Sequence, residues 1–103
     1  MIDLLDKINK QEITIDEAYD IFDEVVEKFH NGQIKQDPYD YMCMDRYERT
    51  ANAHALSLLT LAKWRKEGWP QQCGKCNKEI DYKKFYWTIR DNTIVHIDCA
   101  VKD

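Results

Sequence analysis

The carboxyl-terminal third of the chain carries the residues best suited to metal chemistry. Cys73 and Cys76 form a C-x2-C pair, and His96 and Cys99 form an H-x2-C pair after a spacer of 19 residues. Three thiolates and one imidazole are a complete tetrahedral ligand set for one zinc ion. Since four protein ligands leave no open position for water or substrate, the pattern predicts a structural zinc site and not a catalytic one.

Two other uses of these cysteines fit the sequence less well. A redox C-x-x-C pair would need neither His96 nor Cys99. A pair of disulfides would need an oxidising compartment, and nothing in the sequence points to one. We therefore expect all four residues to bind zinc.

The sequence around the ligands indicates how they are held. Gly74 lies inside the first pair and permits a tight turn, because glycine tolerates backbone angles that other residues avoid. A helical turn over 97–102 would bring the side chains of His96 and Cys99 to one face.

The spacer between the two pairs predicts a β-hairpin. Residues 85–89 are aromatic and β-branched, and residues 90–93 have the composition of a turn. Ile94, Val95 and Ile97 supply the return strand. A knuckle, a hairpin and a short terminal helix together predict a treble-clef-like zinc finger in preference to a zinc ribbon, which would place a further hairpin after the second pair.

The ligand spacing over residues 73–99 resembles that of the first zinc site of LIM domains, which also runs C-x2-C, a spacer of this size and H-x2-C. A LIM domain continues directly into a second zinc module, whereas this sequence ends at Asp103. The resemblance implies zinc and a protein-binding role, but not membership of that family.

The length of 103 residues fits a single domain, with a helical part over 1–70 and the finger over 71–103. A domain this small buries only about two-thirds of its unfolded surface, so a metal ion would add important stability. No basic and apolar leader and no long apolar run are present, so we expect a cytoplasmic protein that does not bind membranes. The predicted fold class is α+β, with the helical part packed on the finger.

Charge is distributed unevenly along the chain, although the net charge is only −4. Residues 1–42 contain eleven acidic and four basic residues, a balance of −7, whereas residues 43–103 contain eight acidic and eleven basic residues, a balance of +3. An acidic half disfavours contact with phosphate and suits a basic partner protein.

The clearest predicted helix follows Thr14, which forms a capping box with Glu17, and ends before Gly32. Apolar residues recur along it at helical spacing. Its other face is acidic and has two interpretations: a solvated surface, or a docking surface for a basic partner. The residues of this acidic face are Asp16, Asp20, Asp23, Glu24 and Glu27.

The segments on either side of this helix give weaker signals. Residues 2–9 predict a short helix, and residues 33–44 predict a loop in which Asp37-Pro38 breaks any helix. Four side chains of this loop either pack over the core, which we expect, or form a contact patch on the surface; they are Tyr39, Tyr41, Met42 and Met44. We expect Cys43 to be a lone buried thiol unrelated to the zinc.

Residues 45–68 predict two helices joined by a tight corner. Asp45 with Glu48 is a second capping signal, Ser57 caps the second helix, and Gly68 ends it. We expect His54 to be a hydrogen-bonded core histidine. The predicted core consists of Phe22, Val25, Phe29, Leu58, Leu61, Trp64 and Trp69, with Trp69 packing the helices onto the finger.

The apolar pattern from Ala51 to Trp64 resembles the helix-turn-helix of bacterial DNA-binding proteins. That family usually has glycine at the corner, where this chain has Ala55. The resemblance implies a DNA-binding regulator using residues 50–66, with phosphate contacts from Lys63, Arg65 and Lys66. It places around the exposed face of the recognition helix Ser57, Leu58, Thr60, Lys63 and Arg65.

The stretch from Trp64 to Cys76 resembles a signature of small bacterial zinc proteins of unassigned function. Its shared positions are Trp64-Arg65, Gly68-Trp69-Pro70 and the C-x2-C pair. We associate some of those proteins with the immunity proteins of bacterial toxin systems. The resemblance implies zinc binding, and no catalytic role comes with it.

Motifs of several common enzyme sites are missing from the sequence. There is no H-E-x-x-H, no glycine-rich phosphate loop and no G-x-S-x-G. Pro70 and Cys73 are similar to the second half of a zinc deaminase motif, but no H-x-E precedes them, since His54 is followed by Ala55 and Leu56. We therefore expect a protein that is not an enzyme and has no small-molecule substrate.

Two hypotheses for function remain from the sequence. The first is a zinc-stabilised protein-binding module that uses its acidic face, in its most specific form an immunity or inhibitor protein that neutralises a basic toxin such as a nuclease. The second is a regulator that binds DNA through residues 50–66.

Overall fold

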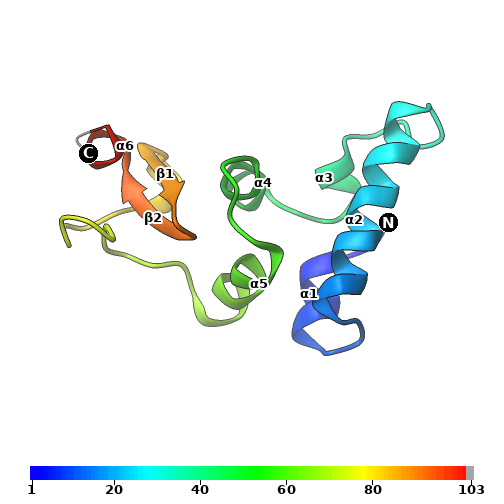
Figure 1. The fold of residues 1–103 in the computed structure, drawn as a ribbon, viewed down its shortest axis with the longest axis horizontal. Coiled ribbons are helices and arrows are strands. Elements are labelled where there is room, and N and C mark those ends of the chain that lie inside the picture. The colour runs from blue at the N-terminus through cyan, green and yellow to red at the C-terminus, as the bar shows by residue number, and fades with distance from the viewer. Residues whose placement is uncertain (102–103) are drawn as a thin grey trace.

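The computed structural model describes residues 1–101, which form a mixed α+β fold with six α-helices and one two-stranded antiparallel sheet. The molecule is elongated, with extents of 43 × 28 × 21 Å. Helices α1 to α3 lie at one end, α4 and α5 lie in the middle, and the hairpin with α6 lies at the other end (Figure 1). The elements are α1 (Leu4–Asn9), α2 (Ile15–His30), α3 (Pro38–Tyr41), α4 (Arg46–Ala53), α5 (Leu58–Glu67), the 3-10 helix η1 (Tyr82–Lys84), β1 (Trp87–Arg90), β2 (Thr93–His96) and α6 (Ile97–Ala100).

The predicted helix caps are confirmed. Thr14 and Glu17 form a reciprocal capping box on α2, and Asp45 and Glu48 form one on α4. The Ser57 hydroxyl accepts from the Thr60 N–H at the start of α5. These local side-chain bonds satisfy N–H groups that have no partner inside the helix. Because the bonding residues lie within three positions of one another, the helix starts could be predicted from the sequence.

The two glycines that were expected to end helices lie directly after the helix ends and have positive φ angles, in the left-handed region. Gly32 follows α2 with φ of +85°, and Gly68 follows α5 with φ of +105°. Other residues reach these angles only at an energetic cost, so glycine is favoured at both positions.

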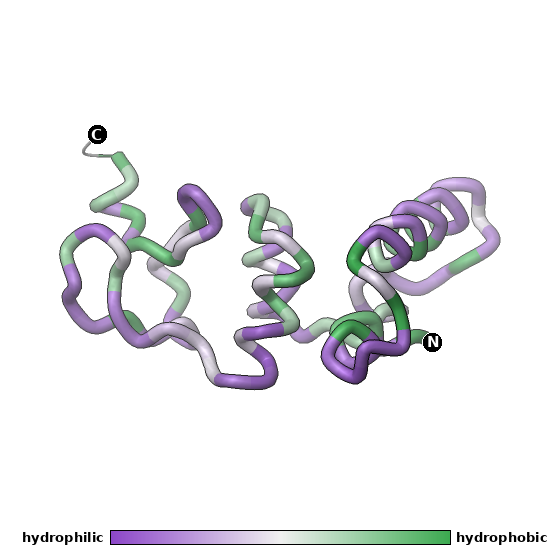
Figure 2. The backbone as a smooth tube through the Cα atoms, turned by 60° about the horizontal axis from the view of Figure 1, so that its bottom comes forward, coloured by the Kyte–Doolittle hydropathy of each residue, from purple (hydrophilic) through white to green (hydrophobic). Residues whose placement is uncertain are grey.

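Helix α2 is amphipathic, as its sequence predicts. Ala18 and Val25 are buried against the rest of the helical part, while Asp16, Asp20 and Glu27 are exposed. Figure 2 shows hydrophilic and hydrophobic positions mixed along this helix. Its buried side meets α1 and α5.

The segment expected to be a loop contains a short helix. Pro38 does not interrupt a helix but begins α3, and the Asp37 carboxylate caps it by accepting from the Tyr39 and Asp40 N–H groups. Proline suits the first helical position because its missing N–H would have had no partner there.

The burial of the sulfur-containing residues around α3 partly matches the expectation. Met42 and Met44 are buried, which confirms the prediction that they pack over the core. Cys43 is only half-buried, so the prediction of a buried thiol is wrong, and it lies outside the group of cysteines that clusters near the carboxyl terminus.

The core is built mainly from aliphatic side chains of α1, α5 and the hairpin, including Leu4, Leu5, Leu61 and Ile94. Val25, Leu58 and Leu61 are buried as predicted. Phe29 is 38% exposed near the end of α2, so its predicted burial is wrong. His54 is exposed at the carboxyl-terminal cap of α4 and is not a core residue as predicted, although its Nδ1 lies within hydrogen-bond distance of the Thr88 hydroxyl oxygen, at 3.4 Å. The remaining predicted core residues are partly buried and pack against the core: Phe22, Trp64 and Trp69.

The corner between α4 and α5 is tight, although it contains no glycine. Ala55 takes φ of +77°, a left-handed conformation that is unfavourable for alanine. The backbone N–H groups of Ala55 and Leu56 bond back to the last turn of α4, and the Asn52 amide donates to the Leu56 carbonyl. These bonds hold the corner despite the unfavourable residue.

The hairpin is shorter than its sequence predicts. Strand β1 begins at Trp87, because Phe85 and Tyr86 have positive φ and leave the extended conformation. The return strand ends at His96. Ile97 was predicted to belong to this strand, but it is the first residue of α6. The helix expected over 97–102 ends at Ala100, and residue 102 lies outside the described residues.

A cluster of aromatic rings joins the hairpin end of the molecule to the helices. Trp69 stacks on Tyr82 with ring centres 4.4 Å apart, and it also contacts Trp64 and Trp87. The Trp87 indole N–H donates to the Tyr82 carbonyl at 2.8 Å. Trp69 therefore packs the helical part onto the carboxyl-terminal part, as predicted.

Candidate metal centre

The four residues expected to bind metal come together in space. The ligand atoms of Cys73, Cys76, His96 and Cys99 all lie within 4.8 Å of one another. His96 Nδ1 lies 3.3 Å from Cys76 Sγ and 3.9 Å from Cys99 Sγ. In a tetrahedral zinc site with Zn–S bonds of about 2.3 Å, neighbouring ligand atoms are about 3.8 Å apart. The cluster therefore has the size and donor set of a site that can hold a metal ion.

A tight backbone knuckle positions the first two cysteines. The Cys73 N–H donates to the Lys78 carbonyl at 2.8 Å, and the Asn77 N–H donates back to the Cys73 carbonyl at 3.0 Å. The residue in the left-handed region is Asn77, with φ of +62°, and not Gly74. The expectation that Gly74 is needed for its backbone angles is therefore wrong.

Glycine is favoured at position 74 for a different reason, which is the close approach of β2. Its N–H donates to the Ile94 carbonyl at 2.9 Å, and a Cβ atom at this position would overlap Thr93 Cγ2. Glycine allows the knuckle to lie directly against the strand that leads to His96.

The Cys73 sulfur is the most enclosed ligand atom. It accepts hydrogen bonds from the N–H groups of Lys75, Cys76 and His96 at 3.3 to 3.5 Å. Burial acts to raise the pKa of the Cys73 thiol, but the three N–H groups outweigh burial and lower it to about 6. Cys73 is thus held as a thiolate near neutral pH, which is the form that binds a metal.

Cys99 has the opposite tendency in the metal-free chain. Partial burial, together with the neighbouring Cys76 and Cys73 sulfurs, raises the pKa of the Cys99 thiol to about 11. A metal cation in the cluster would stabilise this thiolate and displace its proton.

His96 is oriented for coordination through one ring nitrogen. It ends β2 and precedes α6, and its Nε2 lies 3.1 Å from the Glu79 carbonyl oxygen. Since a carbonyl can only accept, Nε2 carries the proton, and Nδ1 presents its lone pair to the cysteines. The contact with the Cys76 sulfur raises the pKa of His96 in the metal-free chain.

The acidic face of α2 lies at the opposite end of the molecule from this cluster (Figure 1). All five carboxylates predicted to form it are exposed. Among the described residues, their one ion pair joins Glu24 to Lys28 at 2.9 Å. The predicted members are thus brought together on one exposed side of α2, and they are Asp16, Asp20, Asp23, Glu24 and Glu27.

The residues proposed to contact DNA are not all exposed. Lys63 and Lys66 are exposed, but Leu58 is fully buried, and Ser57 and Thr60 are half-buried at the start of α5. The expectation that Leu58 lies on an exposed recognition face is therefore wrong.

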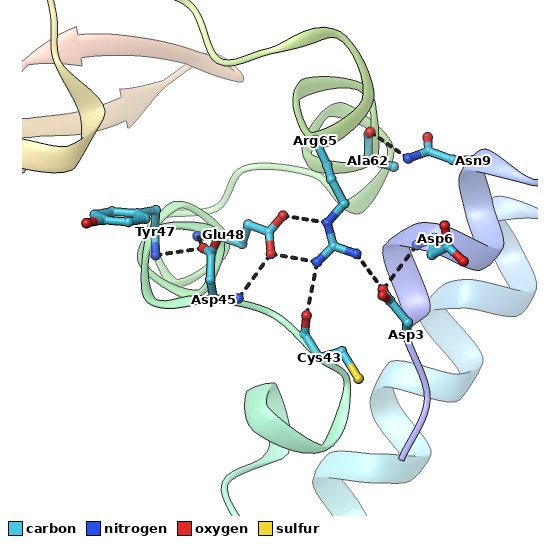
Figure 3. A network of polar contacts seen from close by, with 9 residues as sticks. All are labelled: Asp3, Asp6, Asn9, Cys43, Asp45, Tyr47, Glu48, Ala62 and Arg65. Carbon is cyan, nitrogen blue, oxygen red and sulfur yellow. Dashed lines mark hydrogen bonds and ion pairs between the residues drawn. The ribbon is translucent and has the colours of Figure 1, made fainter.

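Arg65 also differs from the expectation, because it is committed to ion pairs inside the molecule (Figure 3). Its guanidinium forms a bidentate pair with Glu48 at 2.8 and 2.6 Å, contacts the Asp3 carboxylate, and donates to the Cys43 carbonyl. The carboxylates of Glu48 and Asp3 raise the already high pKa of Arg65 further, and Glu48 has the larger effect. Burial acts in the opposite direction, to lower this pKa, but it is outweighed.

The partner of Arg65, the buried carboxylate of Glu48, was not predicted from the sequence. Glu48 is only 3% exposed, although it belongs to the capping box of α4. The capping pattern identified Glu48 as a helix-start residue, but no local signal connects it to an arginine 17 positions later.

Comparisons of this chain with protein-family models, with curated proteins and with solved structures find no match. Within residues 1–101, no helix combines the length and the apolar character needed to cross a membrane.

Proposed function

We propose that Cys73, Cys76, His96 and Cys99 bind one structural zinc ion in a treble-clef-like finger. The observation that carries this proposal is the convergence of four ligand atoms within 4.8 Å. The order of elements supports the finer assignment, since a knuckle supplies the first two ligands, and the end of a hairpin with the first turn of α6 supplies the others. A filled shell of four protein ligands gives the ion a role in folding and not in catalysis.

Metal analysis of the purified full chain tests this assignment. We expect one zinc ion per chain after purification under reducing conditions, and loss of that ion in the Cys99→Ser variant. The Cys43→Ser variant is the matched control, because Cys43 lies outside the cluster and its loss should leave the metal content unchanged. Equal zinc content in all three proteins would contradict the assignment.

For the chain as a whole, we propose a non-enzymatic protein-binding module of the cytoplasm. In this proposal, the acidic face of α2 docks on a basic partner protein. The most specific form of the proposal is an immunity or inhibitor protein whose partner is a toxin that it neutralises. Support comes from the exposure of five carboxylates along one side of a 16-residue helix, four of them without an ion pair in the described residues. Unneutralised charge of one sign steers an oppositely charged partner and adds to its rate of association.

Charge reversal on α2 tests the docking surface. A partner is first captured from the source cell and purified, and its affinity for variants is then measured. We expect Asp20→Lys/Asp23→Lys/Glu27→Lys to weaken binding by a factor on the order of 100 at low salt. The control Glu12→Lys/Glu67→Lys/Glu79→Lys changes the net charge equally at exposed positions elsewhere, and its affinity should stay close to wild type. Equal affinity of both triple variants would contradict the proposal.

The DNA-binding alternative has less support from the geometry. Of the three cations proposed to contact phosphate, Arg65 is held by Glu48 and Asp3, which leaves Lys63 and Lys66 exposed on α5. Binding to duplex DNA at about 50 mM salt, with a steep loss of affinity as the salt concentration rises, would support the DNA-binding alternative.

A further inference from the structure

The amino-terminal end of α5 is a meeting point of three parts of the chain. The Ser57 N–H donates to Asn92 Oδ1 at 3.0 Å, and the Leu58 N–H donates to the Tyr19 hydroxyl oxygen at 3.1 Å. The Thr60 N–H donates to the Ser57 hydroxyl at 3.2 Å. The first N–H groups of a helix have no partner inside the helix, so the stability of this end depends on such outside acceptors.

Asn92 makes a second contact at the same place. Its amide nitrogen donates to the Thr60 hydroxyl, which also accepts from the Ser57 hydroxyl at 2.9 Å. One side chain from the β1–β2 turn therefore bonds both to the backbone at the cap of α5 and to a side chain in its first turn. Figure 1 places this hairpin between α6 and the pair of α4 and α5.

The turn that carries Asn92 is connected to the candidate metal centre through β2. Asn92 and Asp91 form a two-residue turn with φ of +62° and +51°, and the strands it joins are paired from Arg90–Thr93 to Trp87–His96. His96 is a metal-ligand candidate, and β2 lies against the knuckle through the bond from the Gly74 N–H to the Ile94 carbonyl. Metal ligation would thus hold β2 in place at His96 and beside the knuckle at Ile94. Because the turn joins β2 to β1, the turn would be held in place as well.

Tyr19 connects the same helix end to α2. It lies one position before Asp20 on the acidic face, and it is 40% exposed with its hydroxyl bonded to the Leu58 N–H. The bonds from the metal centre to α2 therefore run through the hairpin turn, the cap of α5 and Tyr19.

We infer that metal occupancy of the finger is transmitted through Asn92 to the amino-terminal end of α5 and to Tyr19 of α2, so that zinc regulates the order of the acidic docking surface. The two-state element is the finger, because a metal finger without its ion loses the free energy that holds its ligands together. When the ion leaves, the turn loosens, Asn92 releases Ser57 and Thr60, and the Leu58–Tyr19 bond loses its support. The inference rests on the proposed zinc site and, for its consequence, on the proposed docking surface.

The Asn92→Gly variant separates this route from the metal centre itself. Glycine suits the left-handed angles of a two-residue type I′ turn, so the hairpin should keep its register while the bridging amide is removed. Binding of Cd²⁺, followed by the thiolate-to-metal absorption band, reports whether wild type and variant load the ion. Amide hydrogen exchange of the full chain, with zinc and after chelation, reports the order of the α5 end.

In the wild type, chelation should speed exchange of the Ser57 and Leu58 amides on the order of tenfold, as expected for loss of one or two supporting hydrogen bonds. In Asn92→Gly the ion should still bind, the same amides should already exchange fast with zinc present, and chelation should add little.

Three results would overturn the inference. The first is wild-type exchange at these amides that chelation does not change. The second is an equal response to chelation in wild type and Asn92→Gly, which would show that coupling does not pass through Asn92. The third is the lack of a Cd²⁺ band in the wild type, which removes the zinc site and the inference with it. The first two results leave the zinc site standing if the Cd²⁺ band is present, so the failures are distinguishable.

Discussion

At the scale of single residues, the helical part contains an ion pair between the buried Glu48 and the half-buried Arg65. It joins α4 to α5, and the Asp3 contact adds the start of α1 (Figure 3). A charge enclosed in this way costs free energy unless its partner is present, so the pair fixes which helices can lie together.

Removing one partner of this pair should destabilise the fold. We expect Arg65→Ala to lower the free energy of unfolding by about 2–3 kcal/mol, because Glu48 would be left buried and unpaired. Arg49→Ala is the matched control: Arg49 pairs with Asp37 near the surface, and its loss should cost less than about 1 kcal/mol. Urea unfolding measures both, and equal losses would show that Glu48 is not enclosed as described.

The double replacement Arg65→Met/Glu48→Gln completes this test, because glutamine keeps the side-chain oxygen that accepts from the Asp45 N–H in the capping box. Since neither charge of the pair remains, the double variant should recover much of the stability lost in Arg65→Ala. A double variant no more stable than Arg65→Ala would mean that packing, and not charge, explains the loss.

The thiols of the metal centre predict how metal binding responds to pH. Between pH 6 and pH 11 the metal-free chain holds Cys73 as thiolate and Cys99 as thiol, so loading must release the Cys99 proton. Metal affinity should therefore fall as the pH falls, and fall more steeply below about pH 6, where Cys73 also gains a proton. Cd²⁺ titrations between pH 8 and pH 5 measure this slope, and an affinity independent of pH would contradict thiolate ligation.

At the scale of elements, the knuckle and β2 approach each other so closely that a Cβ atom at Gly74 would overlap the methyl group of Thr93. Gly74→Ala should lower the free energy of unfolding by about 1–3 kcal/mol, because the new methyl group meets Thr93 Cγ2. Thr93→Ser removes that methyl group and should restore most of the loss when combined with Gly74→Ala. Thermal unfolding of the zinc-loaded proteins is the measurement, and an unrescued double variant would show that the Thr93 methyl group is not what disfavours a larger residue at position 74.

The elements that could be predicted from sequence are those decided by local bonds. The capping residues Thr14, Asp45 and Ser57 bond within three positions of themselves, so their roles follow from spacing alone. The clustering of the four candidate metal ligands was also predictable, because C-x2-C and H-x2-C are the spacings of known zinc sites.

What could not be predicted depends on contacts between distant segments. The pairing of Arg65 with Glu48, the steric role of Gly74 beside Thr93 and the bonds of Asn92 to Ser57 all join residues 17 or more positions apart. The left-handed Ala55 is a different case, since the bonds that hold the corner join residues within five positions of one another and outweigh the local preference of alanine. Local pattern carries no information on these pairs.

At the scale of the whole molecule, an aromatic cluster couples the proposed finger to the helices. Trp69 and Trp87 lie in this cluster together with Tyr82. Loss of the ion should loosen the hairpin and expose these indoles to water, so chelation should shift tryptophan emission to longer wavelength. The Cys76→Ser variant should show the shifted emission before any chelator is added, and chelation should then change it little. An emission spectrum unaffected by chelation in the wild type would show that the cluster is held without metal.

The most direct test of the central claim is X-ray absorption at the zinc edge, measured on the purified full chain. Ligation by Cys73, Cys76, His96 and Cys99 predicts a four-coordinate ion with three sulfur atoms at about 2.3 Å and one nitrogen at about 2.0 Å. A shell with a water oxygen and fewer sulfurs, or a purified chain that carries no zinc and keeps its fold, would contradict a closed structural site.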